Sequence, residues 1–129
     1  MPGEPAPQGS KIPGRRKNGG IYLREANRNL KPWREAVEKA ATAHAGKFTG
    51  QRPLTVEYTF HLTKPKSVRR WLPWVKPDLD KLVRAVNDPI SVAGVWDDDG
   101  RVTKIIASKH YADEENQPGA QITIYEEQP

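Results

Sequence analysis

Residues 54–62 read Leu-Thr-Val-Glu-Tyr-Thr-Phe-His-Leu, and this stretch decides the fold that the sequence predicts. Apolar residues occupy every second position from the first to the last, and polar residues fill the positions between them. A period of two residues is typical of a β-strand with one buried face and one exposed face. We therefore expect residues 54–62 to form a strand over a hydrophobic core.

The segments on either side of this strand complete a small α+β domain. Residues 31–46 have a proline near the start, then strong helix formers and a final glycine, which is typical of a helix. The expected buried stripe of this helix is Trp33, Val37, Ala40 and Ala41. Further strands are expected at residues 102–109 and 120–125. Residues 1–129 are thus predicted to form a single domain, a small mixed, mostly antiparallel sheet with two main helices.

The second helix is expected to begin near Asp78 and to end before Pro89. Apolar residues after Asp78 recur at i, i+3, i+4 and i+7, which is the spacing of a buried helical stripe. Asp78 would be the N-cap of this helix. At about 100° per residue, Asp80, Arg84 and Asn87 would form a polar row along one edge of the stripe.

Charge is distributed unevenly along the chain. Residues 1–77 carry 16 Lys/Arg and 5 Asp/Glu (+11), whereas residues 78–129 carry 5 and 11 (−6), which together give the net +5. A basic half of this kind attracts a polyanion. The chain has no cysteine, which excludes disulfides, thiolate zinc sites and thiol nucleophiles. No apolar run reaches the roughly 18 residues of a membrane helix, so we expect no membrane partner.

Two basic segments are candidate nucleic-acid contacts. Residues 1–20 contain four prolines, five glycines and a run of three basic residues, and we expect a flexible basic arm; a solvated terminus without a role is the alternative. Residues 63–77 carry five positive residues and no acid, with two tryptophans between them, a pattern that phosphates and exposed bases favour. The tryptophans could equally be cap or interface residues. The candidate nucleic-acid-binding residues in these segments are Arg15, Arg16, Lys17, Lys64, Lys66, Arg69, Arg70, Trp71, Trp74 and Lys76. Lys81, which follows the second segment, is a further candidate.

Two acidic clusters follow the basic half, Asp78 with Asp80 and the run Asp-Asp-Asp at residues 97–99. Crowded carboxylates repel one another unless a cation lies between them, and hard oxygen ligands suit Mg²⁺ or Mn²⁺. Apolar neighbours such as Trp96 indicate partial burial, where unpaired acids are costly. Each cluster alone is also explained by helix capping or by an ordinary turn. Their occurrence together favours a metal site.

The acidic clusters lie in motifs that resemble a known family. Residues 77–88 read Pro-Asp-Leu-Asp-Lys-Leu-Val-Arg-Ala-Val-Asn-Asp and residues 94–102 read Gly-Val-Trp-Asp-Asp-Asp-Gly-Arg-Val. They resemble the RusA family of Holliday-junction resolvases, whose pattern runs approximately Asp-x-Asp-Asn-Leu-x-Lys-Ala-x-x-Asp and then Asp-Asp-x-Gln-Val. Residues 2–11 resemble the opening signature of that family. A strand usually precedes this signature, so we expect the first strand to be missing or the start to be misplaced.

The resemblance implies a metal-dependent endodeoxyribonuclease that acts as a homodimer on four-way (Holliday) DNA junctions and makes two symmetrical nicks. It implies Asp78, Asp80 and Asp99 as the catalytic ligands of Mg²⁺ or Mn²⁺, with Asp98 as a supporting acid. It also implies a cytoplasmic protein of a bacterial or phage-infected cell.

Three residues depart from the family pattern: Lys81 replaces Asn, Arg84 replaces Lys and Arg101 replaces Gln. Arg84 is expected to stabilise charge on the scissile phosphate, because a guanidinium can pair bidentately with it. A guanidinium does not readily give up a proton, so Arg84 does not fit a role that needs a titratable lysine. Lys81 or Lys76 would add positive charge.

Two other functions are compatible with the sequence. One is a related metal nuclease that acts on forks or other branched DNA. The other is a basic nucleic-acid-binding protein without catalysis, whose acids only cap a helix and shape a turn. A histidine-based site is disfavoured, because His44, His61 and His110 lack ligand spacing.

Overall fold

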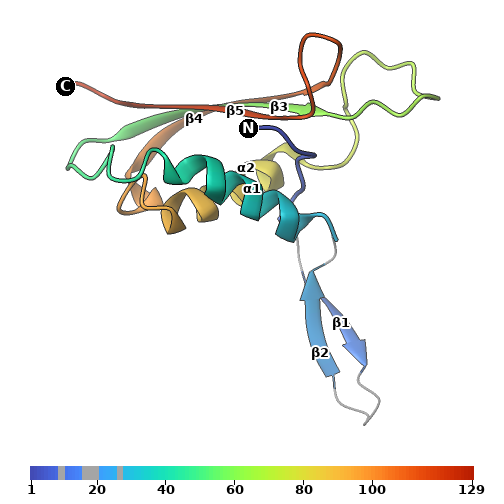
Figure 1. Cartoon of the computed structure of the whole chain (residues 1–129), viewed down its shortest axis with the longest axis horizontal. Coiled ribbons are helices and arrows are strands. Elements are labelled where there is room, and N and C mark those ends of the chain that lie inside the picture. The colour runs from blue at the N-terminus through green and yellow to red at the C-terminus, as the bar shows by residue number, and fades with distance from the viewer. Residues whose placement is uncertain (9–10, 16–20, 26–27) are drawn as a thin grey trace.

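The computed structural model describes residues 1–8, 11–15, 21–25 and 28–129, with only the backbone of residues 11–15 and 21–25. Its elements are β1 (Lys11–Arg15), β2 (Ile21–Glu25), α1 (Leu30–Thr42), β3 (Leu54–Leu62), α2 (Leu79–Val92), the short 3-10 helix η1 (Asp99–Arg101), β4 (Val102–Tyr111) and β5 (Gly119–Glu126). A three-stranded sheet forms one layer, and α1 and α2 lie side by side on one of its faces (Figure 1). The predicted α+β architecture with two main helices is confirmed.

Strand β3, which is the predicted strand at residues 54–62, is the centre of the sheet, whose order is β4-β3-β5. It pairs parallel with β4 and antiparallel with β5. The sheet is therefore mixed, but its pairings are divided equally between the two kinds. A separate two-stranded sheet, the hairpin of β1 and β2, contains a second antiparallel pairing. The parallel pair exists because α2 lies in the connection between β3 and β4 and returns the chain to the same end of the sheet.

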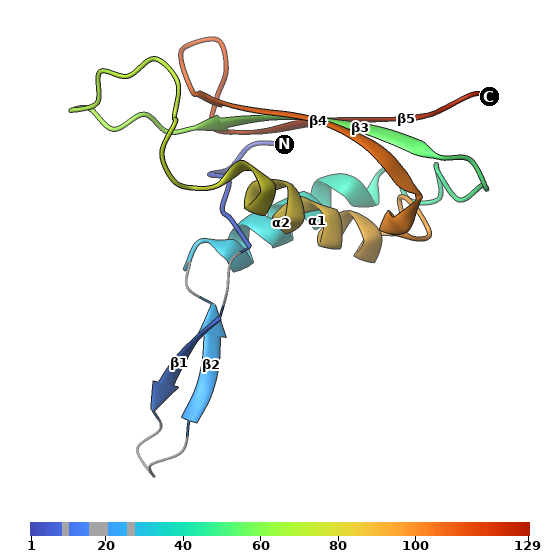
Figure 2. The same cartoon turned by 180° about the vertical axis from the view of Figure 1, so that it is seen from behind.

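The hydrophobic core fills the space between the sheet and the helices. Alternate residues of β3 point into it, and Leu54, Val56 and Phe60 are fully buried. The core also contains Trp33, Val37 and Ala41 from α1, Leu82, Val86 and Ile90 from α2, and Trp96. Of the stripe expected on α1, Ala40 is only half-buried. No helix covers the opposite face of the sheet in the described part of the chain (Figure 2).

Helix α2 continues through Pro89 to Val92, so the expected end before Pro89 is wrong. Proline has no N–H, so the helix loses one backbone hydrogen bond there. Tertiary packing compensates, because Pro89 and Ile90 are both buried in the core. The last turn is also held by Ser91, whose Oγ accepts a hydrogen bond of 2.6 Å from Nε1 of Trp96.

The N-terminal segment runs beside β5 and then reaches α2. The N–H of Gly3 donates to the carbonyl of Pro118 at 3.0 Å, Ala6 is buried, and the N–H of Gln8 donates to the carbonyl of Lys81 at 3.0 Å. These contacts tie the start of the chain to both layers of the fold.

The arm predicted for residues 1–20 contains the strand β1, which its composition did not indicate. The hairpin of β1 and β2 projects away from the sheet and helices (Figure 1). Proline is tolerated in such a strand, because a two-stranded hairpin leaves half of its backbone groups without a neighbour. Residues 9–10 and 16–20 lie outside the described residues, and the flexibility of the arm stays a prediction. No helix in the described ranges has the length and apolar character required to cross a membrane.

Candidate active site

An open groove with a volume of about 810 Å³ lies between α2 and β4. Its floor includes Ile105 and Ala107 of β4, and its charged and polar side chains come from the N-terminal segment, α2 and η1. These polar residues are Gln8, Asp80, Arg84, Asn87, Asp88 and Asp99. The two acidic motifs of the sequence therefore meet in one groove, although 18 residues separate Asp80 from Asp99 along the chain.

The predicted polar row on α2 is confirmed, because Asp80, Arg84 and Asn87 all line the groove. With a rise of 1.5 Å per residue, Asp80 and Asn87 lie about 10 Å apart along the helix axis. The expected partial burial of the acids is wrong, since Asp80 and Asp99 are exposed to solvent. Their apolar neighbours point into the core instead, which leaves the carboxylates free to meet a ligand.

A buried tyrosine supports the groove next to Asp99. The hydroxyl of Tyr58 donates a hydrogen bond of 2.5 Å to Oδ1 of Asn87. Burial raises the pKa of Tyr58 well above its usual value, the hydrogen bond with Asn87 acts in the opposite direction, and the negative charge of Asp99 raises the pKa further. Tyr58 therefore remains protonated and acts as a fixed donor that holds Asn87. Sequence reasoning assigned Tyr58 only to the core, although a buried tyrosine hydroxyl usually needs a partner.

Two predicted metal ligands do not line this groove. Asp78 is the N-cap residue of α2, as expected, but its side chain makes no capping hydrogen bond. Its carboxylate lies 3.5 Å from Nζ of Lys81. Asp98 accepts a hydrogen bond of 2.8 Å from the N–H of Gly100 and so caps η1. Both residues adjoin the acids that do line the groove.

Arg101, one of the departures from the family pattern, joins η1 to the loop before β3. Its guanidinium donates to the carbonyl of Phe48 and, at 2.8 and 3.1 Å, to the carbonyl of Arg52. It also pairs with Asp97 at 2.9 Å, and this hydrogen bond is the main reason that the pKa of Asp97 is lowered. Arg101 thereby anchors the short helix that carries Asp99.

Two other residues of the groove were not predicted as site residues from the sequence. Asp88 lines it and forms an ion pair with Arg34 of α1. The signal was present, because Asp88 is the last acid of the motif at residues 77–88. Gln8 also lines the groove, and its Oε1 is buried without a hydrogen-bond partner among the described atoms. Its position in the opening motif at residues 2–11 was the available signal.

The acids of the groove suit a hard divalent cation. Mg²⁺ in proteins is often held by one or two carboxylates, with water and substrate phosphate as its other ligands. Asp80 and Asp99 can supply two such carboxylates. No group of three or more acidic or histidine side chains with metal-binding geometry occurs in the described part of the chain.

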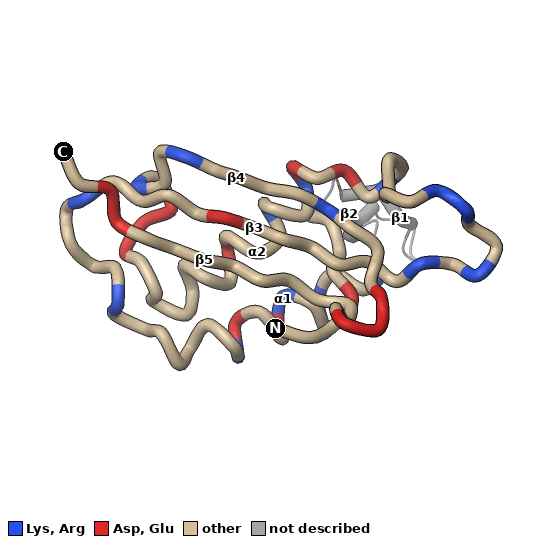
Figure 3. The backbone as a smooth tube through the Cα atoms, turned by 90° about the horizontal axis from the view of Figure 1, so that it is seen from above, with Lys and Arg blue, Asp and Glu red and all other residues tan. Residues whose placement is uncertain are grey.

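The basic segment at residues 63–77 forms a loop between β3 and α2. Figure 3 shows basic residues following one another around this loop. Trp71 and Trp74 are 75% and 64% exposed, and their rings meet edge to face with centroids 6.4 Å apart. Of the predicted DNA contacts, the exposed basic residues here are Lys64, Lys66, Arg69 and Lys76. Arg16 and Lys17 lie outside the described residues, and of Arg15 only the backbone in β1 is described.

Strand β4 anchors the loop through contacts that the sequence did not indicate. Nζ of Lys109 donates to the carbonyls of Val75 and Pro77 at 2.7 and 2.8 Å. Arg70 donates to the hydroxyl of Tyr111 at 3.1 Å. These contacts hold the end of the basic loop next to the first turn of α2, where Asp80 lies.

Residues 2–125 of the 129-residue chain match the family model of endodeoxyribonuclease RusA. The chain belongs to the RusA family. The resemblance inferred from the motifs is confirmed, and the match contains all six polar residues of the groove. Proteins of the RusA family are endonucleases and therefore hydrolases, and their substrate is Holliday-junction DNA. No curated protein matches this RusA-family chain.

Proposed function

We propose that this protein is a Mg²⁺- or Mn²⁺-dependent endonuclease that resolves four-way DNA junctions by paired symmetrical cuts. The observation that carries the proposal is that Asp80, Asp99 and Arg84 line one groove in a chain of the RusA family. Carboxylates and a guanidinium in one open groove can serve a metal and a phosphate at the same time.

Asp80 and Asp99 are the principal ligands in this proposal, and Asp78 and Asp98 are the additional ligands that the family pattern implies. When bound, the cation lowers the pKa of a coordinated water and offsets negative charge on the scissile phosphate. The ion pair of Asp78 with Lys81 involves Oδ2 of Asp78, at 3.5 Å, and places a second positive charge beside the groove.

Arg84 binds the phosphate. It lies one helical turn from Asp80 on the same side of α2, so a phosphate that reaches the metal ligands also reaches the guanidinium. Its charge stabilises the charge that develops on the phosphate oxygens. Asn87, which Tyr58 holds in place, provides a polar group at the other end of the row.

The basic loop and the N-terminal arm provide the affinity for DNA. Contacts to phosphates give sequence-independent binding and weaken with salt. A homodimer would present two grooves and two basic loops to a junction that itself has nearly twofold symmetry. The shape of the dimer would then select branched DNA.

A fluorescently labelled four-way junction, incubated with and without Mg²⁺, tests the proposal. The substitutions D80N and D99N are expected to lower the cleavage rate by at least about 100-fold and to change junction affinity less than threefold. D97N is the matched control, because Asp97 is an acid of the same cluster that pairs with Arg101 and does not line the groove. If D80N and D99N nick junctions as fast as the unchanged protein, the site is wrong.

The same assay separates the other candidate functions. A binding protein without catalysis would shift the junction in a gel but never nick it. A fork nuclease would cleave a labelled fork faster than the junction, and linear duplex is the negative substrate. The mass in solution, measured by light scattering, tests the homodimer.

A further inference from the structure

Two histidines lie side by side on the face of the sheet that no described helix covers. His61 of β3 and His110 of β4 are 49 positions apart in the sequence, but parallel pairing places them directly opposite each other. Phe60 and Leu62 point into the core, so the alternation along β3 directs His61 to the outer face of the sheet. The spacing of the histidines in the sequence did not indicate this pair.

The separation of the two rings suits a shared metal ion. Their centroids are 5.7 Å apart, and their planes are inclined to each other by 31°. With metal–nitrogen bonds of about 2.0–2.1 Å, two imidazoles on one tetrahedral ion have centroids roughly 5 Å apart. Adjacent strands are themselves about 4.8 Å apart, so small side-chain rotations are enough to bring one nitrogen of each ring to a common ion.

A serine orients one of the two rings. Nε2 of His110 lies 2.9 Å from Oγ of Ser108, which is two residues earlier on the same face of β4. With its proton on Nε2, His110 donates to this hydroxyl and presents the lone pair of Nδ1. Histidine ligands of metal ions commonly bind through one nitrogen in this way, while the other nitrogen donates to a fixed acceptor.

A carboxylate next to the pair favours a cation. Oδ1 of Asp113 accepts hydrogen bonds from the N–H groups of Asn116 and Glu115 at 2.8 and 3.0 Å, which hold it in the turn after β4. The pKa of Asp113 is lowered mainly by the N–H of Asn116, and the charge of His61 acts in the same direction. The negative charge of Asp113 therefore acts on His61 in return.

Water has access to the pair. His61 and His110 are both half-buried, and an open pocket of about 450 Å³ adjoins His61. Asn116 and Gln117 contribute polar groups to this pocket. Among the described residues, no third histidine or acid completes a ligand set with the two rings. Water would therefore occupy the remaining coordination positions of an ion held here.

We propose that His61 and His110 form a binding site for one divalent transition-metal ion, with Zn²⁺ as its probe. Imidazole nitrogen suits Zn²⁺ and Cu²⁺, whereas the carboxylates of the candidate active site suit Mg²⁺. The ion joins the ends of β3 and β4, next to Thr63, where the basic loop leaves the sheet. Because the pair exists only in the folded chain, binding stabilises the fold. This site is independent of the proposed nuclease chemistry.

Calorimetric titration of the untagged 129-residue chain with Zn²⁺ tests the site. Excess Mg²⁺ is present throughout, because it occupies the hard oxygen ligands of the candidate active site. One Zn²⁺ per chain is expected, with a rise in Tm of roughly 5 °C at saturation. H61Q and H110Q should each weaken the binding at least about tenfold, because a single imidazole is left.

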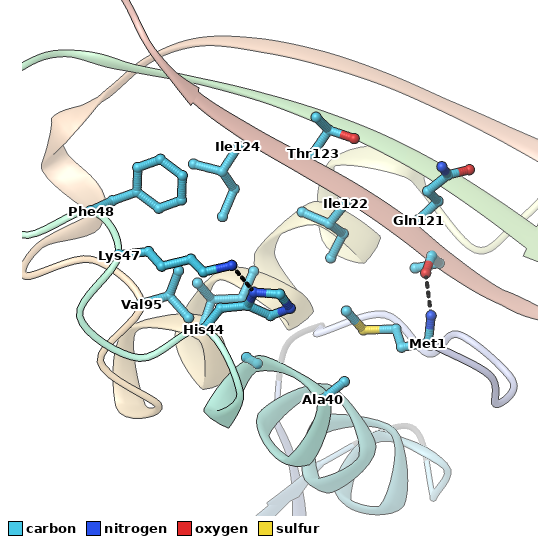
Figure 4. A pocket seen from close by; sticks show the side chains of 13 residues that line it. Met1, Ala40, His44, Lys47, Phe48, Val95, Gln121, Ile122, Thr123 and Ile124 are labelled. Atoms are coloured by element: carbon cyan, nitrogen blue, oxygen red, sulfur yellow. Dashed lines mark hydrogen bonds between the residues drawn. The ribbon is translucent and has the colours of Figure 1, made fainter.

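H44Q is the matched control, because His44 follows α1 on the helix side of the sheet. Nζ of Lys47 donates to its Nδ1 at 2.7 Å, and its ring borders a separate pocket (Figure 4). H44Q should change the affinity for Zn²⁺ less than about twofold, since it is remote from the pair. Absence of binding in the unchanged chain, an equal loss in H44Q, or full binding by H61Q or H110Q would overturn the proposal.

NMR spectra of the imidazole groups locate the ion without any substitution. Zn²⁺ should shift the ring resonances of His61 and His110 and leave those of His44 unchanged. The mass in solution should be the same with and without Zn²⁺, and a doubling would place the ion between two copies and overturn the single-chain site. Loss of Zn²⁺ binding in the double variant D80N/D99N would overturn it too, because the ion would then belong to the candidate active site.

Discussion

Replacing Arg101 with alanine is expected to destabilise the protein and to disturb Asp99. The Arg101 side chain is 13% exposed and links η1 to the loop between α1 and β3. The R101A variant leaves the carbonyls of Phe48 and Arg52 without their donor. Because Asp99 belongs to the same short helix as Arg101, release of that helix alters the groove.

The size of the effect follows from the two carbonyl acceptors. A hydrogen bond from a charged donor contributes about 1.5 to 3 kcal/mol, and the lower end applies because water can reach Arg52. The two hydrogen bonds together therefore contribute about 3 kcal/mol to the free energy of unfolding. For a domain of this size that corresponds to a fall in Tm of roughly 10 °C.

Thermal and urea unfolding of R101A and D97N measure this contribution. D97N removes only the exposed ion pair and keeps both carbonyl contacts of Arg101. Its decrease in the free energy of unfolding should therefore be less than a quarter of the decrease in R101A. R101Q, which restores the usual family residue, should fall between R101A and the unchanged protein. A Tm of R101A within about 2 °C of the unchanged protein would refute the reasoning, as would an equal loss in D97N.

Three further predictions concern the groove and the loop. Burial holds the pKa of Tyr58 above its usual value of 10, so the unfolded chain loses this proton first and the stability of the fold decreases as pH rises above about 10. The Y58F variant should therefore lose less Tm between pH 8 and pH 11 than the unchanged protein does. Identical profiles of Tm against pH would contradict this prediction. K109M should make the basic loop several-fold more sensitive to trypsin than K104M does, because Lys109 donates to the loop and Lys104, an exposed residue of the same strand, is the matched control. Equal digestion rates of the two variants would exclude Lys109 as an anchor of the loop. W74A should weaken junction binding about tenfold in fluorescence anisotropy while W74F retains most of it, because stacking on a base contributes about 1–3 kcal/mol; unchanged affinity of W74A would remove Trp74 from the DNA surface.

Most elements of the fold could be predicted from local patterns. The alternation in residues 54–62 predicted β3 with its observed bounds, and the helical spacing after Asp78 predicted the start of α2. The end of α2 could not be predicted in this way. Pro89 is unfavourable in a helix by local rules, and only the burial of Pro89 and Ile90 against the core explains why the helix continues.

The candidate site shows the same division. The row of Asp80, Arg84 and Asn87 follows from 3.6 residues per turn, so the sequence was sufficient to place these side chains on one side of α2. The groove depends on η1 and β4 being packed beside that helix. The roles of Tyr58 and Lys109 depend on partners 29 and 32 or more residues away, which no local pattern indicates.

The sequence by itself determined the periodicity of each element, the acidic and basic motifs, and through those motifs the RusA family. Such features depend on residues within one or two turns of one another, where spacing alone places a side chain on a face. The tertiary structure decided that Asp80 and Asp99 share a groove while Asp78 and Asp98 lie beside it. Those outcomes depend on how distant segments pack, because burial of the common core sets their distances.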